Sequence, residues 1–265
     1  MGAGASGICW PNFLCERLSS EGYFVIRYDH RDVGKSSLID YKTNPYTLND
    51  LASDALAILD AYQVQKAHVV GMSMGGYIAQ ILAIDHPERL YSLVSLMSSP
   101  DGSVTMASAQ GKDTSSYSLP PPAPEAVKTW NQMKLLPMKT KEDRINSSLV
   151  NWKLCAGALA FNEQEFRKLE ERIFERTKSY EALFNHWPAM SVRANRTVEL
   201  QKIKVPTLVI HGDSDVVLPV EHGKATARAI PGSTLVIIPG MGHAIGEFYS
   251  EKIASLILSH VEQKK

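Results

Sequence analysis

The chain has 265 residues, in which 28 Lys and Arg balance 28 Asp and Glu. This balance argues against the positive field of a nucleic-acid-binding domain, and the length suits one α/β domain with a large core. The most apolar stretch, residues 69–84, is too short and too often interrupted by polar residues to span a bilayer. The three cysteines, Cys9, Cys15 and Cys155, include no Cys-x-x-Cys pair, so they predict neither a disulfide framework nor a metal site. We therefore expect a cytoplasmic protein without nucleic-acid or membrane partners; no feature predicts its oligomeric state.

Short β-branched runs alternate with helical patterns near both ends of the chain. In chain order, the first 100 residues predict a helix over 11–20, a strand over 23–28, a helix over 47–62, a strand over 67–71, a helix over 74–86 and a strand over 91–97. The alternation returns after residue 205, with strands over 206–211 and 234–238 and helices over 220–229 and 247–262. This order predicts a mostly parallel sheet covered by helices on both faces.

The middle of the chain has a different pattern. Residues 98–124 are rich in Ser, Pro and Gly, and no strand signal follows until residue 205. Amphipathic periodicity predicts helices over 124–136, 140–157, 161–178 and 180–192. We therefore expect residues 1–100 and 201–265 to form the α/β core, and residues 101–200 to form a helical cap insertion.

Ser73 is the candidate nucleophile. It lies in Gly71-Met72-Ser73-Met74-Gly75, between the predicted strand over 67–71 and the predicted helix over 74–86. Strand, Gly-x-Ser-x-Gly and helix are the parts of a nucleophile elbow, in which glycines permit a strained turn that exposes the serine hydroxyl. The alternative, an ordinary serine in a glycine-rich turn, does not account for this context.

Acyl transfer by a serine also needs an imidazole and a carboxylate. Asp215, in the loop after the strand over 206–211, is the candidate acid, and Asp213 in the same loop is more simply a turn residue. His243, among glycines after the last predicted strand, is the candidate base, because an exposed loop can reach a neighbouring loop. The order Ser73, Asp215, His243 is the Ser…Asp…His order of α/β hydrolases.

With these residues, the chain resembles the α/β-hydrolase superfamily, and within it the aclacinomycin methylesterase group. The resemblance is carried by residues 7–11, 25–36, 68–75 and 239–243. It implies an eight-stranded sheet, a helical cap corresponding to residues 101–200, and no cofactor.

The resemblance also assigns individual residues. Ser73, Asp215 and His243 match the triad of the family, and the backbone amides of Ala3 and Met74 match its oxyanion hole. In the loop over residues 29–36, it implies a structural role and a pairing of Asp29 with Arg31.

The segment Met1–Gly7 fits three motifs. A Gly-x-Gly-x-x-Gly dinucleotide loop needs a preceding strand, and Met-Gly-x-x-x-Ser would direct N-myristoylation, which a polybasic patch does not support here. We favour the oxyanion loop implied by the resemblance. In the family this loop follows a central strand, so we expect a longer form with a strand hairpin and the central strand upstream of Met1. The absence of upstream in-frame coding sequence, together with stable soluble expression of this chain, would refute that expectation.

The predicted substrate is a small-molecule carboxylic ester with a hydrophobic acyl part, and a methyl ester is one candidate. The apolar residues Trp10, Met72, Trp130 and Trp187 are candidates to line its pocket, although residues of these types are more often plain core. Perhydrolase, amidase or lactonase chemistry would use the same triad, and a catalytically silent binding protein is the alternative of a different class.

Overall fold

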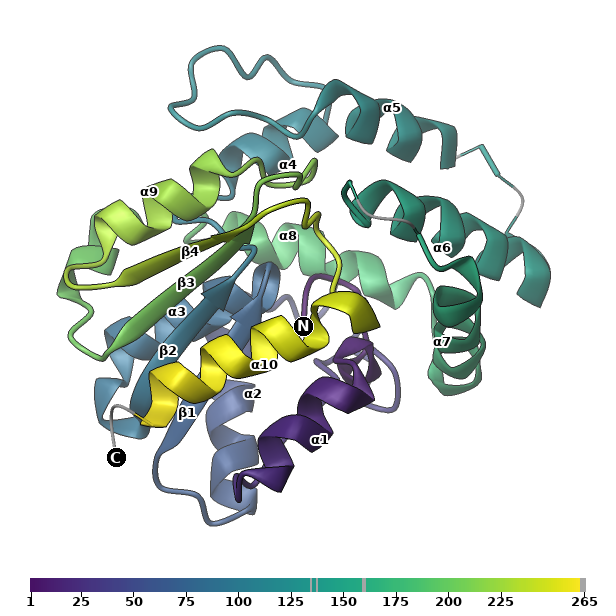
Figure 1. Ribbon diagram of the computed structural model, residues 1–265. Coiled ribbons are helices and arrows are strands. Elements are labelled where there is room, and N and C mark those ends of the chain that lie inside the picture. The colour runs from purple at the N-terminus through teal and green to yellow at the C-terminus, as the bar shows by residue number, and fades with distance from the viewer. Residues whose placement is uncertain (134, 137, 159–160, 263–265) are drawn as a thin grey trace.

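The computed structural model, shown in Figure 1, describes residues 1–133, 135–136, 138–158 and 161–262. Within these residues, four parallel strands pair side by side in the order β1 (Ala67–Met72), β2 (Leu90–Leu96), β3 (Thr207–Gly212) and β4 (Thr234–Ile238). Met72 pairs with Leu96, and Gly212 pairs with Ile238. Because the strands are parallel, the loops that leave their carboxyl ends emerge along the same edge of the sheet. The predicted parallel α/β architecture is confirmed.

Helices cover both faces of this sheet. On one face, α1 (Asn12–Ser20) and α10 (Glu247–Glu262) pack beside each other, as Figure 1 shows. On the other face lie α2 (Leu48–Ala61), α3 (Met74–Asp85) and α9 (Glu221–Ala229). Along β2, Val94 and Leu96 belong to the core on the α10 side, whereas Leu90 and Leu93 belong to the core on the α3 side. Two apolar layers therefore sandwich the sheet.

Local sequence explains where the main helices begin. Thr47 and Asp50 form a reciprocal capping box at the start of α2, and Thr140 and Asp143 do the same at the start of α6 (Lys141–Cys155). Helix α3 follows β1 after a single residue and is buried on every side from residue 74 to residue 83, which accounts for its nearly continuous apolar run.

The middle of the chain is helical, as predicted. Its helices are α4 (Ser103–Ala109), α5 (Pro124–Met133), α6 (Lys141–Cys155), α7 (Glu163–Arg176) and α8 (His186–Ser191). Four short 3₁₀ turns complete the described elements: η1 (Gly7–Cys9), η2 (Pro87–Arg89), η3 (Ala182–Asn185) and η4 (Glu199–Lys202). Residue 134, in the helix predicted over 124–136, lies outside the described residues. The helix predicted over 180–192 is divided into η3 and α8, and α4 was not predicted because its flanks are rich in Ser and Gly.

The two ends of the middle segment lie side by side. Asp101 and Asn195 form an antiparallel bridge, and the Arg196 amide donates to the Pro100 carbonyl at 2.8 Å. The Arg196 guanidinium is fully buried, donates to the Ser99 carbonyl at 2.9 Å and to two further carbonyls, and lies over an aromatic ring of α3. Backbone oxygens thus satisfy this buried cation, and the chain leaves the core and returns to it at one place.

Two sequence expectations about the sheet are wrong for the described residues. Residues 23–28 form no strand, and the sheet has four strands rather than the eight implied by the resemblance. A β-branched run becomes a strand only when a neighbouring strand accepts its ladder of hydrogen bonds. Among the described residues, no strand pairs with residues 23–28, and β1 pairs only with β2.

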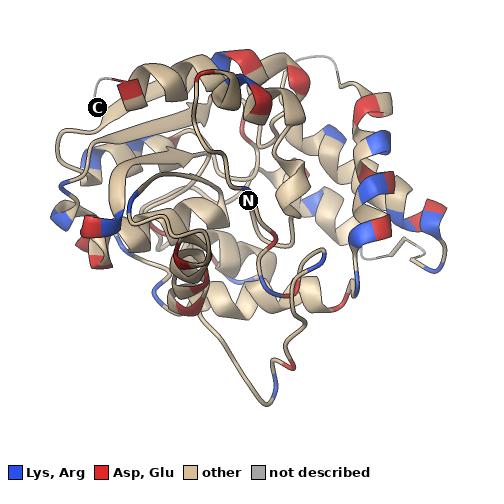
Figure 2. Ribbon diagram, turned by 90° about the horizontal axis from the view of Figure 1, so that it is seen from below, with Lys and Arg blue, Asp and Glu red and all other residues tan. Residues whose placement is uncertain are grey.

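Charged residues of both signs are mixed over the ribbon, most visibly along the helices at the right of Figure 2. No helix in the described part of the chain combines the length and the apolar character needed to cross a membrane.

Candidate active site

Ser73 occupies the single-residue turn between β1 and α3. Its φ of 54° and ψ of −119° lie in a region that residues with side chains rarely adopt. The turn is tight: a Cβ on Gly71 would lie 2.1 Å from the Gly75 carbonyl oxygen. The Ser73 amide donates to the carbonyl of Leu96 at 3.0 Å, which ties the strained residue to the end of β2. The glycines of the motif are therefore required by the close approach of helix to strand, as expected for a nucleophile elbow.

Asp215 is buried in the loop after β3, and both of its carboxylate oxygens have partners. Oδ1 accepts from the amides of Val217 at 2.9 Å and Leu218 at 2.8 Å, and Oδ2 accepts from Nδ1 of His243 at 2.7 Å. Burial alone would raise the pKa of this carboxyl, but His243 and His211 beside it outweigh burial and hold the pKa well below its usual range. Asp215 is therefore an ionised carboxylate.

His243 lies in the loop after β4, and its protonation pattern follows from its partner. An ionised carboxylate only accepts, so Nδ1 of His243 carries the hydrogen that faces Asp215. In the neutral ring, Nε2 is then left with a lone pair that can accept a proton. Asp213 has a different task, since it accepts from the amide of Gly240 at 2.7 Å and thereby anchors the loop that carries His243.

The middle segment also touches the loop of His243. The amide of Ala158 donates to the carbonyl of Gly240 at 2.9 Å, and Gly157 forms a bridge with Met241. A Cβ on Gly157 would lie 2.4 Å from the Gly240 carbonyl oxygen, so only glycine permits this approach. The turn after α6 therefore packs directly on the candidate base loop.

The structure brings Asp215 and His243 together and places Ser73 at the same edge of the sheet. In the part of the chain that it describes, no hydrogen bond joins Ser73 to His243. Such bonds are often long without a substrate and tighten when one binds.

The two candidate oxyanion amides belong to Met74, which follows Ser73, and to Ala3 in the turn Gly2–Ala5. Met74 is the first residue of α3, where amides have no acceptor within the helix. The turn Gly2–Ala5 lies opposite, and a Cβ on Gly2 would be 3.6 Å from the Ser73 hydroxyl oxygen. Neither the Ala3 amide nor the Met74 amide donates to an acceptor within the described residues. Both N–H groups can therefore serve a negatively charged oxygen near Ser73.

Asp29 holds the segment that follows this turn. Its Oδ1 accepts from the Ser6 hydroxyl at 2.6 Å and from the Gly7 amide at 2.7 Å, while Oδ2 accepts from Arg176 of α7 at 2.6 Å. The predicted pairing of Asp29 with Arg31 is wrong. Arg31 instead makes two bonds, at 2.6 and 2.7 Å, to a carboxylate of α2. The resemblance implied the pairing, but α2 and α7 offer the better-placed partners.

The four residues predicted to line a substrate pocket fall into two groups. Trp10 and Met72 are buried in the apolar core on the α10 side of the sheet. Trp130, on α5, donates to Asn151 at 3.1 Å, and Trp187, on α8, is 37% exposed. Trp130 and Trp187 lie outside the core cluster that holds the other two, so a shared lining role stays a prediction.

Two buried histidines that the sequence gave no reason to single out touch the candidate site. Nε2 of His211 lies 2.7 Å from the Leu218 carbonyl and 3.4 Å from Oδ2 of Asp215. Nδ1 of His186, on α8, accepts from the amide of Gly4 at 2.9 Å. No local pattern reveals either contact, and 182 positions separate Gly4 from His186.

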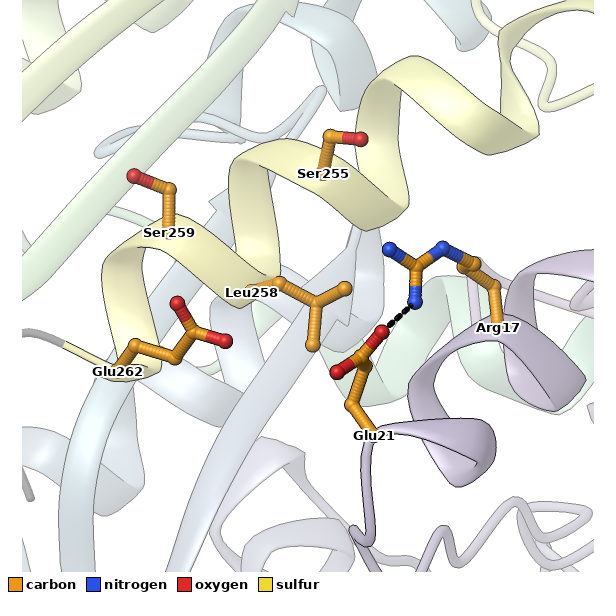
Figure 3. Close-up of a pocket in the computed structure, with 6 residues that line it drawn as sticks. All are labelled: Arg17, Glu21, Ser255, Leu258, Ser259 and Glu262. Carbon is orange, nitrogen blue, oxygen red and sulfur yellow. Dashed lines mark hydrogen bonds and ion pairs between the residues drawn. The ribbon is translucent and has the colours of Figure 1, made fainter.

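A surface cavity of about 520 Å³ lies elsewhere, between α1 and the end of α10, as Figure 3 shows. It is lined by Arg17, Glu21, Ser255, Leu258, Ser259 and Glu262. Arg17 and Glu21 pair with each other across one helical turn. The cavity contains none of the candidate catalytic residues and is not part of this site.

Comparison with known proteins identifies the family of this chain. Residues 2–248 match the family described as the alpha/beta hydrolase fold. The chain is 37% identical to rhodomycin D methylesterase DauP of Streptomyces sp. (strain C5), and 35% identical to rhodomycin D methylesterase DnrP of Streptomyces peucetius. Each match covers 98% of this chain and 88% of the relative.

Solved structures show the same fold. The esterase EaEST from Exiguobacterium antarcticum aligns with a TM-score of 0.72 at 22% identity, over 99% of this chain and 90% of that one. A likeness at this identity supports the fold alone. The family match and the two methylesterases carry the assignment further: this chain belongs to the α/β-hydrolase family.

Proposed function

We propose that this chain is a serine ester hydrolase that acts on a small carboxylic ester through an acyl-enzyme on Ser73. The observation that carries the proposal is the 2.7 Å hydrogen bond between Asp215 and His243, at the sheet edge where Ser73 occupies a strained elbow. A buried, ionised carboxylate on Nδ1 fixes the tautomer in which Nε2 of the imidazole can act as a base.

In the first half of the reaction, Oγ of Ser73 attacks the ester carbonyl carbon while Nε2 of His243 takes the hydroxyl proton. Negative charge develops on the carbonyl oxygen, and the amides of Ala3 and Met74 stabilise it. When the tetrahedral intermediate collapses, His243 gives its proton to the departing alkoxide. The alcohol leaves, and the acyl group stays on Ser73.

In the second half, a water molecule replaces the alcohol. His243 takes a proton from the water as its oxygen attacks the acyl carbon, and the same two amides face the oxyanion. Collapse of this intermediate breaks the bond to Oγ, and His243 returns the proton to Ser73. Asp215 stays ionised throughout and stabilises the imidazolium formed in each half.

A methyl ester with a hydrophobic acyl part is the substrate class that we propose. Two relatives of at least 35% identity over nearly the whole chain are named as methylesterases of rhodomycin D. The apolar candidates Trp10, Met72, Trp130 and Trp187 would suit the same class if they line the pocket. Fold alone does not separate esters from lactones, amides or peracids, so the substrate panel must contain all four.

The test combines an active-site probe with turnover. A fluorophosphonate probe should label the purified chain, and labelling should vanish in Ser73→Ala. Turnover of p-nitrophenyl acetate and of rhodomycin D should fall to background in the same variant.

Absence of both labelling and turnover in a chain that circular dichroism shows to be folded would favour a binding protein. Labelling that persists in Ser73→Ala would exclude Ser73 as the nucleophile.

A further inference from the structure

His186 links the middle segment to two parts of the core that border the candidate site. It is the first residue of α8, and its side chain is completely buried. Nδ1 lies 2.9 Å from the amide nitrogen of Gly4, and Nε2 lies 3.0 Å from the carbonyl oxygen of Arg31. The ring therefore bridges the turn Gly2–Ala5 and the loop after residue 30.

The two partners determine the state of the ring. An amide N–H only donates, so Nδ1 of His186 must present its lone pair to Gly4, and a carbonyl only accepts, so Nε2 must carry the hydrogen toward Arg31. This is one tautomer of the neutral imidazole. Burial lowers the pKa of His186, which favours the same neutral form.

Neighbouring side chains hold the ring in this orientation. The rings of His30 and Tyr46 meet it edge to face, with centroids 5.9 and 6.3 Å away. The adjacent Asn185 donates to the carboxylate of Asp32 at 3.0 Å, which ties the start of α8 to the core independently of His186. Nδ1 of His186, which accepts from the Gly4 amide, is thus held in place by packed neighbours.

The amides of the turn Gly2–Ala5 show what the hydrogen bond from Gly4 to His186 does. The Ala5 amide donates to the Gly2 carbonyl at 3.2 Å, and Gly4 has the positive φ of 67° that such a turn needs at its third residue. The Gly4 amide is taken by His186. Among the described residues, the Gly2 and Ala3 amides have no acceptor, and a Cβ on Gly2 would lie 3.6 Å from the Ser73 hydroxyl oxygen.

We propose that His186 is a positioning residue for the oxyanion hole: by accepting the Gly4 amide, it orients the turn so that the Ala3 amide faces the reacting carbonyl. The inference rests on the proposed function, because it assigns a role to His186 in the reaction at Ser73. His186 itself touches no reacting atom. Helix α8 thereby contributes to transition-state stabilisation through the turn Gly2–Ala5.

Two substitutions separate the two bonds of this ring. In His186→Asn, the amide oxygen can take the place of Nδ1 and keep an acceptor for Gly4 while the bond to Arg31 is lost. In His186→Gln, the amide nitrogen can take the place of Nε2 and keep the donor to Arg31 while the Gly4 acceptor is lost. Each variant removes one buried hydrogen bond, so we expect similar losses of thermal stability.

Turnover of p-nitrophenyl acetate should distinguish the variants. Removing an oxyanion donor costs about 100- to 1000-fold in kcat, so a donor that is displaced rather than removed should cost about tenfold. We expect that loss in His186→Gln with KM changed less than about twofold, and near wild-type kcat in His186→Asn. Asn185→Ala, which removes the neighbouring bond to Asp32, should lower stability and leave kcat unchanged.

Hydrogen exchange of the Gly4 amide gives a readout that does not depend on activity. It should be protected in the wild type and in His186→Asn and should exchange faster in His186→Gln. Equal kcat in the two His186 variants, or equal protection of Gly4, would overturn the inference even if the esterase is active. If the wild type turns over no ester, the proposed function fails, and with it the catalytic role assigned to His186.

Discussion

The two halves of the candidate site are held in different ways. Asp215 and His243 are 28 positions apart in the chain, and their loops are anchored to one another by contacts such as that of Asp213 with Gly240. The other half, here called the oxyanion half, consists of the turn Gly2–Ala5 and the adjoining residues Ser6 and Gly7. It depends on partners far away in the sequence. Gly4 and His186 are 182 positions apart, and Asp29 and Arg176 are 147 positions apart.

This difference shows where the middle segment matters for chemistry. Asp215 and His243 are positioned chiefly by adjacent loops of the parallel sheet, with one contact from the middle segment at Gly157 and Ala158. The turn before Ser6 is positioned by α7 and α8, through Arg176 and His186. Substitutions in the two halves should therefore differ in size and in their dependence on pH.

The largest effect is expected at the base. His243→Ala should lower kcat for p-nitrophenyl acetate by a factor on the order of 10⁶, because a serine without its base is a weak nucleophile. Single-turnover kinetics at neutral pH would measure it. The double variant with Ser73→Ala should be no slower than either single variant, because the two residues act as a unit. Additive losses would contradict a shared mechanism.

The second-largest loss of kcat is expected at the carboxylate of Asp215. Asp215→Asn should lower kcat by a factor on the order of 10⁴, because the amide cannot hold His243 in its basic tautomer. Asp213→Asn is the matched control in the same loop, since an amide oxygen can still accept from Gly240. Steady-state kinetics of both variants would check the assignment, and a larger loss in Asp213→Asn would reverse it.

In the oxyanion half, substitution of Asp29 should lower kcat less than the two substitutions above and should also lower stability. Asp29→Asn keeps an acceptor for Ser6 and Gly7 but removes the charge that pairs with Arg176. We expect a loss of about 1–3 kcal/mol in the free energy of unfolding, measured in urea, and a loss of about tenfold in kcat. Unchanged kcat with reduced stability would mean that α7 does not contribute to the oxyanion half.

The last expected effect, on stability alone, concerns acid sensitivity. Burial lowers the pKa of His186, and burial together with the neighbouring positive groups lowers that of His30. Below the unfolded-state pKa of about 6.5, the unfolded chain binds protons that the folded chain does not, so the free energy of unfolding falls as pH falls, by up to about 1.4 kcal/mol per pH unit for each group. Urea unfolding at several pH values from 7.5 to 5 would measure this slope, which His186→Asn should reduce.

Asp215 responds to acid in the same direction but in a lower pH range. Its pKa is lowered in the fold, so its contribution to stability is fully present above the unfolded-state pKa of about 4 and is lost only as pH falls below that value. The oxyanion half should therefore weaken at a milder acidity than the acid–base half. An unfolding free energy independent of pH between 7.5 and 5 would contradict the contrast.

Much of the core was predictable because its determinants are local. Gly71, Ser73 and Gly75 identify the elbow in five consecutive residues, and most strands and helices follow from apolar periodicity. The strand expected over residues 23–28 was wrong because strand formation requires a partner that a run of residues does not specify. For the same reason the pairing of Asp29 with Arg31 was wrong, since the partner each side chain finds depends on which helices pack beside it.

His186 shows most clearly which contacts cannot be predicted from the sequence. In the sequence it is an ordinary histidine within the helix predicted over 180–192, and its contact with Gly4 exists only in the folded chain. The candidate triad could be identified from sequence because residue type and chain order constrain it. The residues that support the turn Gly2–Ala5 could not be identified in this way, because side chains able to accept a hydrogen bond occur on almost every element.

The bridge between Asp101 and Asn195 has a consequence for exchanging parts between members of this family. Since the polypeptide departs from the sheet and rejoins it at adjacent positions, the intervening stretch can be replaced without lengthening any other connection. A graft cut at those positions would also discard His186, together with its support for the turn at Gly4. Chimaeras that retain residues 157–196, and with them Gly157, Arg176 and His186, and swap only what precedes them should keep the reaction while changing which esters are accepted.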